Sequence, residues 1–285
     1  MKNIDQLARA FREKHSHTVL FVMPCAWDAF SAMLFERAGF SCVGTTSGGV
    51  NWTRGRRDYI YSTPAKEMLD AYGEIVEATS LPVSGDLENG YGESPESVAD
   101  TIRRAIDVGM VGGSIEDQKT VPTDDEFTDG VLFSHDDAVQ RIKYARQAAD
   151  DAGFDFTLTA RCEVFYTGSD NSFGIAVERL NAYREAGADC LFVPGLNDLN
   201  LLSQLVDEVD GPISFGMGAT PEPITLQMLE DIGIRRVSTG GGITRAIFSA
   251  IEKIATELSV DGTASYLQGI MSEADINRMF NERNQ

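Results

Sequence analysis

The sequence predicts a (β/α)8 TIM barrel, and three observations support this fold class. Eight short apolar runs alternate with longer amphipathic segments along most of the 285-residue chain. Strands that alternate with helices form parallel sheets, and eight of them in one domain favour a closed barrel over an open doubly wound sheet, which the pattern alone leaves possible. The hydrophobic content of 42% is sufficient for one large α/β core or two smaller ones.

The predicted strands are short apolar runs that end at glycine or polar residues. In chain order they are Leu20–Met23, Ser41–Thr45, Leu81–Leu87, Gly112–Glu116, Asp155–Arg161, Asp189–Val193, Pro212–Phe215 and Arg236–Ser238. A segment with helical periodicity separates each run from the next, so all eight strands can lie parallel.

The predicted helices often begin at a good capping residue, as at Ser94 before Pro95, and several end at glycine, as at Gly39. They are Ile4–Lys14, Ala29–Ala38, Ala65–Thr79, Pro95–Val108, Asp136–Ala152, Gly174–Ala186, Leu199–Val209, Thr225–Ile232 and Thr244–Leu258. We expect residues 1–285 to form a single barrel domain, with 259–285 as a C-terminal helical extension that docks on a neighbouring subunit.

Carboxylates gather where the predicted strands end, which is the edge of a (β/α)8 barrel that carries its chemistry. Asp86 and Glu88 leave the third strand on the same face, so two carboxylates share one small space. A proton, a cation or an outward splay must relieve their repulsion. Glu116 and Asp117 end the next strand, and this second acidic end favours a bound cation over a solvated acidic loop.

The donor types at this edge indicate which metal would bind. All three histidines lie away from the predicted strand ends, so oxygen donors dominate. Hard oxygen ligands select Mg²⁺ or Mn²⁺ over Zn²⁺. Because Mg²⁺ keeps several of its waters, we expect one direct carboxylate, Asp86, with Glu88 and Glu116 holding metal-bound water.

Arg161 ends the fifth predicted strand, on the inward face that it shares with Thr159 and Glu163. A structural ion pair with one of the acids is one interpretation of this arginine. Its position opposite the proposed metal favours the other, in which the guanidinium binds a substrate oxyanion. Cys162 alternates with Arg161 and is expected to point toward the helices.

The charge balance limits the classes of partner. The net charge is −20 and no basic stripe occurs, which argues against nucleic acid and anionic membranes. The acidic residues are spread along the chain. This pattern fits a surface suited to a high-salt cytoplasm, and it equally fits an acidic enzyme of ordinary habitat.

Neither a membrane span nor a signal peptide is evident, so the sequence predicts a cytoplasmic protein. Four cysteines, at positions 25, 42, 162 and 190, are scattered without any Cys-x-x-Cys pair. They fit buried reduced thiols better than disulfides or a zinc site.

Six short motifs follow one another along the chain: Pro24–Ala29 (PCAWDA), Thr46–Gly49 (TSGG), Gly55–Asp58 (GRRD), Gly85–Gly92 (GDLENGYG), Ile115–Asp117 (IED) and Ala160–Glu163 (ARCE). In this order they resemble the isocitrate lyase/phosphoenolpyruvate mutase superfamily, over about residues 20–257. The resemblance implies a (β/α)8 barrel whose last helix is exchanged between subunits of a dimer or tetramer. It also implies Mg²⁺ dependence and a 2-oxo acid or related carboxylate as substrate.

The resemblance also implies roles for individual residues. It makes Asp86 the direct metal ligand with Glu88 and Glu116 as its outer partners, Thr46, Ser47 and Gly48 the substrate-binding turn, and Asp58 and Arg161 the catalytic pair. Reactions of the superfamily pass through an enolate-like species. A metal, an arginine and backbone N–H groups together stabilise the negative charge that develops on the oxygen of this enolate-like species.

Departures from the superfamily pattern reduce the number of reactions that this protein is expected to catalyse. Lyases of the superfamily carry a Lys-Lys/Arg-Cys-Gly-His loop after the fourth strand, whereas the corresponding stretch here, Gln118–Phe127, has no cysteine and no histidine. A thiol-dependent isocitrate or methylisocitrate lyase is therefore disfavoured. Cys25 replaces a usual glycine, and Glu163 stands where aspartate is frequent, so the pocket is expected to differ in shape.

The resulting prediction is an Mg²⁺-dependent lyase, hydrolase or mutase that breaks or rearranges a C–C or P–C bond next to a 2-oxo acid. The candidates are enzymes of the oxaloacetate decarboxylase, phosphonopyruvate hydrolase and phosphoenolpyruvate mutase kinds; the last two stay open without support, because their Lys- and Asn-rich gating loops are not reproduced here. One alternative is a phosphate-binding barrel of another class, prompted by the glycines of Gly216–Gly218 and Thr239–Gly242. The other is a barrel that binds a carboxylate without turnover.

Overall fold

Nine short parallel strands form one sheet, in the order β1-β9-β8-β7-β6-β5-β4-β3-β2. The computed structural model describes residues 3–58, 62–119, 131–218 and 223–283. The strands are β1 (Phe21–Met23), β2 (Cys25–Ala26), β3 (Val43–Thr45), β4 (Val83–Asp86), β5 (Gly112–Glu116), β6 (Thr157–Arg161), β7 (Cys190–Phe192), β8 (Ile213–Gly216) and β9 (Arg236–Ser238). All eight predicted strands are confirmed, with shorter bounds at several ends.

The two outer strands of this order are consecutive in sequence, and together they close the barrel. β1 pairs with β9, and β2 pairs with β3. Pro24 separates them and cannot donate a backbone hydrogen bond. The Cys25 N–H then bonds the side-chain Oγ1 of Thr239 at 2.9 Å instead of a strand carbonyl. The predicted (β/α)8 barrel is thus confirmed, with its first strand divided into two pieces.

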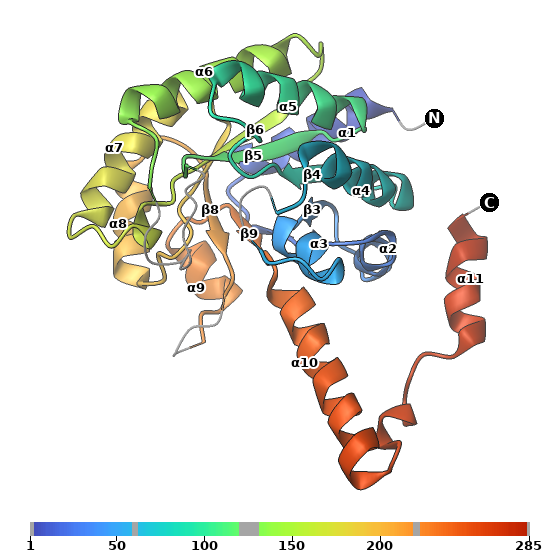
Figure 1. The fold of residues 1–285 in the computed structure, drawn as a ribbon. Coiled ribbons are helices and arrows are strands. Elements are labelled where there is room, and N and C mark those ends of the chain that lie inside the picture. The colour runs from blue at the N-terminus through green and yellow to red at the C-terminus, as the bar shows by residue number, and fades with distance from the viewer. Residues whose placement is uncertain (1–2, 59–61, 120–130, 219–222, 284–285) are drawn as a thin grey trace. The chain divides into compact units, whose positions relative to one another are not determined.

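Helices of the first unit pack around the sheet (Figure 1). They are α1 (Ile4–Ser16), α2 (Ala29–Arg37), α3 (Ser47–Thr53), α4 (Ala65–Ala78), α5 (Pro95–Asp107), α6 (His135–Asp150), α7 (Ser172–Glu185), α8 (Leu199–Glu208) and α9 (Leu226–Asp231). Two further helices, α10 (Gly242–Thr256) and α11 (Glu273–Arg283), make up most of the C-terminal part of the chain. The predicted cap is confirmed at α5, where the Ser94 side chain accepts from Ser97 N–H and Pro95 occupies the first turn. The short α3 was not predicted.

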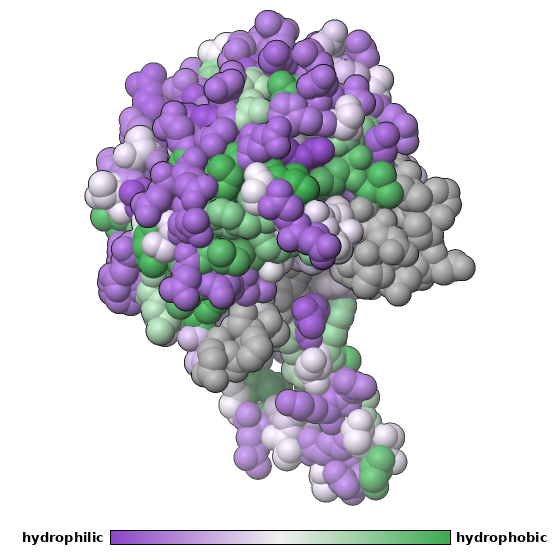
Figure 2. Space-filling view, turned by 90° about the vertical axis from the view of Figure 1, so that its left-hand side faces the viewer, coloured by the Kyte–Doolittle hydropathy of each residue, from purple (hydrophilic) through white to green (hydrophobic). Residues whose placement is uncertain are grey.

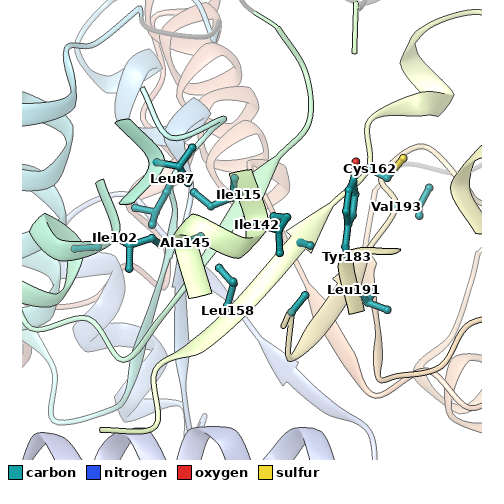
Figure 3. Packing of buried hydrophobic residues seen from close by; sticks show 14 of the residues in the cluster. Leu87, Ile102, Ile115, Ile142, Ala145, Leu158, Cys162, Tyr183, Leu191 and Val193 are labelled. Carbon is teal, nitrogen blue, oxygen red and sulfur yellow. The ribbon is translucent and has the colours of Figure 1, made fainter. Parts of the chain in front are cut away.

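The core lies between the strands and the surrounding helices. Along β6 and the residue that follows it, Leu158, Ala160 and Cys162 are fully buried toward the helices, while Thr159 and Arg161 alternate with them. Figure 3 shows Leu158 and Cys162 in this layer. The predicted outward direction of Cys162 is confirmed.

Helix α1 covers the N-terminal end of the barrel. Phe11 is fully buried, and a Cβ added to Gly112 of β5 would lie 2.9 Å from its ring. His15, one turn later, accepts from Arg236 Nη1 through Nε2 at 3.3 Å and donates from Nδ1 to the Phe11 carbonyl at 3.0 Å. Only glycine at position 112 leaves room for this aromatic side chain, so α1 seals the floor of the barrel.

The chain divides into two compact units, Met1–Ile243 and Thr244–Gln285. The predicted extension, 259–285, lies inside the second unit. Within the described ranges, no helix is long and apolar enough to cross a membrane. Figure 2 shows hydrophilic side chains over much of the drawn face of the first unit, in line with the net charge of −20.

Candidate functional site

Asp86, at the C-terminal end of β4, is fixed by hydrogen bonds at several of its atoms. Its Oδ2 accepts from the Ser47 backbone N–H at 3.0 Å and from the Ser47 hydroxyl at 2.9 Å. Its own N–H donates to Thr45 Oγ1 at 2.9 Å, and its carbonyl accepts from the Tyr72 hydroxyl at 2.8 Å. One carboxylate oxygen is therefore held by α3, while Oδ1 lies on the side of Arg161.

Arg161, at the end of β6, lies among three carboxylates. Its Nη1 is 3.2 Å from Glu116 Oε2 and 3.6 Å from Asp86 Oδ1. Its Nε donates to Glu163 Oε1, and its guanidinium lies 5.6 Å from the centre of the Phe192 ring. The structure thus brings together Asp86, Glu116 and Arg161, which the sequence places at the ends of three different strands.

The cluster carries more negative than positive charge. Burial raises the pKa of Glu116 well above its ordinary value; Arg161 opposes this shift, and Glu163, Asp86 and Glu88 add to it. Burial also raises the pKa of Glu163 to about 6, against the attraction of Arg161. One guanidinium therefore does not neutralise the carboxylates around it, and the site favours a further positive charge.

Glu88 lies on a turn with an unusual backbone. Its φ is 48° and that of Tyr91 is 53°, both in the left-handed region that non-glycine residues rarely occupy. The carbonyl of Glu88 accepts from Glu116 N–H at 3.0 Å, so the turn is tied to the end of β5. Arg141 of α6 holds the C-terminal end of this turn by donating to the Gly92 carbonyl at 2.9 Å. Such strain is concentrated at functional sites.

Asp58 rests on the first turn of α3. A Cβ placed on Gly48 would lie 2.5 Å from Oδ2 of Asp58, so the carboxylate lies directly against this glycine. The Thr46 hydroxyl caps α3 by accepting from Gly49 N–H at 3.3 Å. The predicted turn and Asp58 are therefore adjacent. The donors of Ser47 point to Asp86, a contact that the sequence did not indicate.

The donor set fits a hard divalent cation bound partly through water. Asp86 is partly exposed, with 19% of its side chain accessible, and Glu116 is nearly buried. In the part of the chain that the structure describes, no three His, Cys, Asp or Glu side chains converge as direct ligands of one ion. Asp86 and Glu116 are thus the side chains here that could contribute oxygen ligands to a cation, with water completing its shell.

The glycine-rich turn after β9 is already filled by protein. A Cβ on Gly241 would lie 2.6 Å from the Trp52 ring, so the indole of α3 packs on this glycine. Gly242 N–H donates to the Thr239 carbonyl at 2.9 Å, and the Thr239 hydroxyl accepts from Cys25. A phosphate at this turn would compete with Trp52 for the same space, which weighs against phosphate binding by Thr239–Gly242.

All four cysteines are buried free thiols. Burial raises the pKa of each one, to about 12 for Cys42. None is therefore poised as a thiolate at neutral pH. The stretch Gln118–Phe127, which lacks the cysteine of the lyase loop, falls largely outside the described residues, since these stop at 119 and resume at 131.

Three residues that contact the site had no role assigned from the sequence. They are Thr45, Tyr72 and Phe192. The clearest available signal was Tyr72, which follows Met68 on the apolar face of α4 and needs a partner for its hydroxyl once buried. The other contacts depend on how neighbouring strands end.

Comparison with known proteins identifies the family. The model of the phosphoenolpyruvate phosphomutase family matches residues 11–259, most of the chain. The chain belongs to the phosphoenolpyruvate phosphomutase family. This membership confirms the predicted superfamily and supports an enzyme that acts on a C–C or P–C bond.

The relatives described here align with this chain over most of its length. The 2-methylisocitrate lyase of Escherichia coli K12 is 30% identical over 240 residues, which cover 83% of this chain and 79% of that one. A Burkholderia cenocepacia J2315 structure, provisionally described as a lyase/mutase, is 39% identical with a TM-score of 0.90 over 97% of this chain and 96% of that one. A 2,3-dimethylmalate lyase structure is 25% identical with a TM-score of 0.85, over 98% and 96%.

Proposed function

We propose that this protein is an Mg²⁺-dependent enzyme that cleaves a C–C bond next to a 2-oxo acid through an enolate-like species. The observation that carries the proposal is the convergence of Asp86, Glu116 and Glu163 on Arg161 at the C-terminal rim of the barrel. An anionic substrate needs positive charge in this acidic site. A bound cation beside Arg161 would supply it.

Asp86 would hold the cation directly, and Glu88 and Glu116 would hold it through water. When bound, Mg²⁺ supplies positive charge next to the oxygen that becomes negative in the reaction. The excess of carboxylates over guanidinium in this cluster supports the assignment, because their mutual repulsion falls when a cation binds.

The protein's own groups have separate tasks in this proposal. Arg161 directs its guanidinium at the developing oxyanion, and its bonds to Glu116 and Glu163 fix the direction. Asp58, which lies on Gly48, is placed to take a proton from the substrate or return it. The neutral, buried thiols take no part in proton transfer.

We propose C–C rather than P–C cleavage because, among the curated relatives, the lyase of Escherichia coli covers 83% of this chain and the phosphorylmutase of Arabidopsis thaliana covers 67%. The 2-methylisocitrate lyase and the 2,3-dimethylmalate lyase are lyases by name and match this chain over most of its length. Since the sequence lacks the cysteine of the thiol-dependent lyases in its loop, we propose a substrate whose cleavage needs no thiol acid, such as oxaloacetate or a substituted malate.

The decisive experiment is turnover with Mg²⁺ of four compounds: oxaloacetate, 2,3-dimethylmalate, phosphonopyruvate and 2-methylisocitrate. We expect turnover of oxaloacetate or a malate homologue, lost in excess chelator and in Asp86→Ala. Asp70→Ala, on the exposed face of α4 where Asp70 pairs with Lys66, is the matched control and should retain activity. Binding of oxalate with Mg²⁺ but no turnover of any 2-oxo acid would instead support the non-catalytic barrel.

We also propose that the second unit docks on another copy of this chain. Its helices and connections expose large apolar side chains: Ile247, Ile251, Leu258, Val260, Leu267, Ile270, Met271 and Phe280. Surfaces of this kind usually mark an interface. Light scattering should give a dimer or tetramer, and Ile251→Asp should shift it toward monomer. A monomeric wild-type protein at micromolar concentration would refute the docking.

A further inference from the structure

Asp117 follows the metal-site residue Glu116 and points the opposite way, into the layer between the barrel and α7. It is 4% exposed. Its Oδ2 accepts from Arg179 Nη1 at 3.0 Å and from the Tyr183 hydroxyl at 2.5 Å. The buried charge is therefore compensated by two donors from one helix.

The same aspartate contacts the main chain on both sides of Cys162. Its Oδ1 accepts from Glu163 N–H at 2.9 Å, and its own N–H donates to the Arg161 carbonyl at 3.1 Å. These two bonds bracket the point where β6 ends. They determine how the chain turns after Arg161, and hence whether the Glu163 side chain can reach the guanidinium.

The donors on Asp117 are themselves fixed. Arg179 also donates to the Tyr183 hydroxyl at 3.1 Å and to the Phe133 carbonyl at 2.8 Å. Phe133 N–H in turn donates to the Asp117 carbonyl at 2.9 Å. The carboxylate thus belongs to a closed hydrogen-bonded network that α7 supports, and its position is set independently of any ligand in the barrel.

We propose that Asp117 is a positioning residue, which holds the main chain of Arg161 and Glu163 so that their side chains meet on the inner face of the barrel. Neither the superfamily motifs nor the geometry of the acidic cluster assigns it this role. Its link to catalysis rests on the proposed function, whereas its effect on the Arg161–Glu163 contact does not.

The chain contains a matched control at the other end of β6. Asp189 Oδ2 accepts from Leu158 N–H at 2.8 Å, from Arg12 at 2.8 Å and from Arg146 at 3.0 Å. Like Asp117, it joins a backbone N–H of the β6 region to arginine side chains. Unlike Asp117, Asp189 lies at the N-terminal end of β6. Asp189→Asn should therefore lower the stability of the protein and leave the contact between Arg161 and Glu163 unchanged.

The primary test is an NMR measurement of the Arg161 Nε–H signal, assigned from its loss in Arg161→Lys. In Asp117→Asn, we expect its exchange with solvent to accelerate about tenfold or more, because the bond to Glu163 is weakened. In Asp189→Asn, the exchange rate should stay within about twofold of wild type. Equal rates in wild type and Asp117→Asn would overturn the proposal.

A second measurement connects the contact to the proposed function. Oxalate binding in the presence of Mg²⁺ should weaken about tenfold in Asp117→Asn and remain unchanged in Asp189→Asn. If wild type binds no oxalate, the proposed function fails while the NMR test still decides the role of Asp117. Should Asp117→Asn not fold, Tyr183→Phe removes one donor and keeps the ion pair, and it should accelerate exchange in the same direction. An unchanged exchange rate in Tyr183→Phe would then count against the proposal.

Discussion

Ser47 donates both its backbone N–H and its hydroxyl to the same carboxylate oxygen of Asp86, at 3.0 and 2.9 Å. The first residue of α3 is thereby bonded to the last residue of β4. Two donors on Oδ2 fix the carboxylate plane, so Oδ1 is presented to Arg161 and to the interior of the rim. A carboxylate held in this way loses little conformational entropy when it binds a cation.

Replacing Arg161 by lysine should lower kcat more than it raises KM. The guanidinium uses Nε toward Glu163 and Nη1 toward Glu116, and a single ammonium group cannot make both contacts in the same geometry. Loss of one oxyanion donor corresponds to about 2–4 kcal/mol of transition-state stabilisation. Steady-state kinetics and oxalate calorimetry measure the two effects. If the variant binds oxalate normally and only KM changes, Arg161 contributes to substrate binding and not to stabilisation of the transition state.

The substitution Gly48→Ala should displace Asp58. The added Cβ would lie 2.5 Å from the Asp58 carboxylate, whose side chain can rotate away at little cost to the fold. We therefore expect about a tenfold or larger fall in kcat, as for a lost general base, with Tm within a few degrees of wild type. Kinetics and a thermal melt measure both.

Gly73→Ala provides the control for this change. Gly73 lies within α4, and a Cβ there would make ordinary contact with Val108 at 3.7 Å. It should raise stability by about 0.5–1 kcal/mol and leave kcat unchanged. Equal activity in Gly48→Ala and Gly73→Ala would remove Asp58 from the reaction.

Cys162→Ser should keep turnover within a few-fold of wild type. The thiol is fully buried on the helix side of β6, and burial raises its pKa well above the ordinary value. A serine hydroxyl in this apolar layer should cost about 1–3 kcal/mol of stability. Activity at a temperature well below the melt, measured beside Cys42→Ser, separates the two effects. Complete inactivity of a folded Cys162→Ser variant would restore a thiol mechanism.

His15 should make the protein less stable in mild acid. Burial, with Arg236 next in importance, lowers its pKa from 6.5 to about 3. Between these values the unfolded chain binds a proton that the folded chain does not, so stability present above pH 6.5 is lost as the pH falls. At pH 5.5 the loss is about 1.4 kcal/mol relative to pH 7.5.

Urea unfolding of wild type and His15→Gln at these two pH values measures the contribution. Glutamine does not titrate and can still accept from Arg236, so the variant should lose about 1.4 kcal/mol less between pH 7.5 and 5.5. An identical change in both proteins would show that His15 is protonated in the folded state as readily as in the unfolded chain.

Alternating apolar runs were sufficient to predict the barrel and all eight of its strand positions. The division of the first strand at Pro24 could not be predicted, because the Cys25 N–H bonds a threonine side chain from the far end of the chain. Helix α3 was also missed. Its Gly48-Gly49 pair has low helix propensity, and the segment is held by the Thr46 cap and by Asp86 instead.

The site was predictable to the extent that strand ends determine it. Asp86, Glu116 and Arg161 end strands β4, β5 and β6, and parallel neighbours bring such residues together. Hydrogen-bond partners that depend on the conformation of the turns after the strands were not predictable from the sequence. Glu163 bends back onto Arg161, and Asp117 turns away from it toward Arg179 of α7.

The packing of Phe11 and His15 of α1 beneath the barrel strands affects how a ligand can enter and leave. With Phe11 under Gly112 and His15 against Arg236, α1 closes one end of the barrel. A ligand bound near Arg161 must then enter and leave through the same rim. If the enzyme splits its substrate, the two fragments share one exit, and the fragment nearer the floor departs last. That slower fragment competes with incoming substrate, whereas the other inhibits only by rebinding to the occupied enzyme.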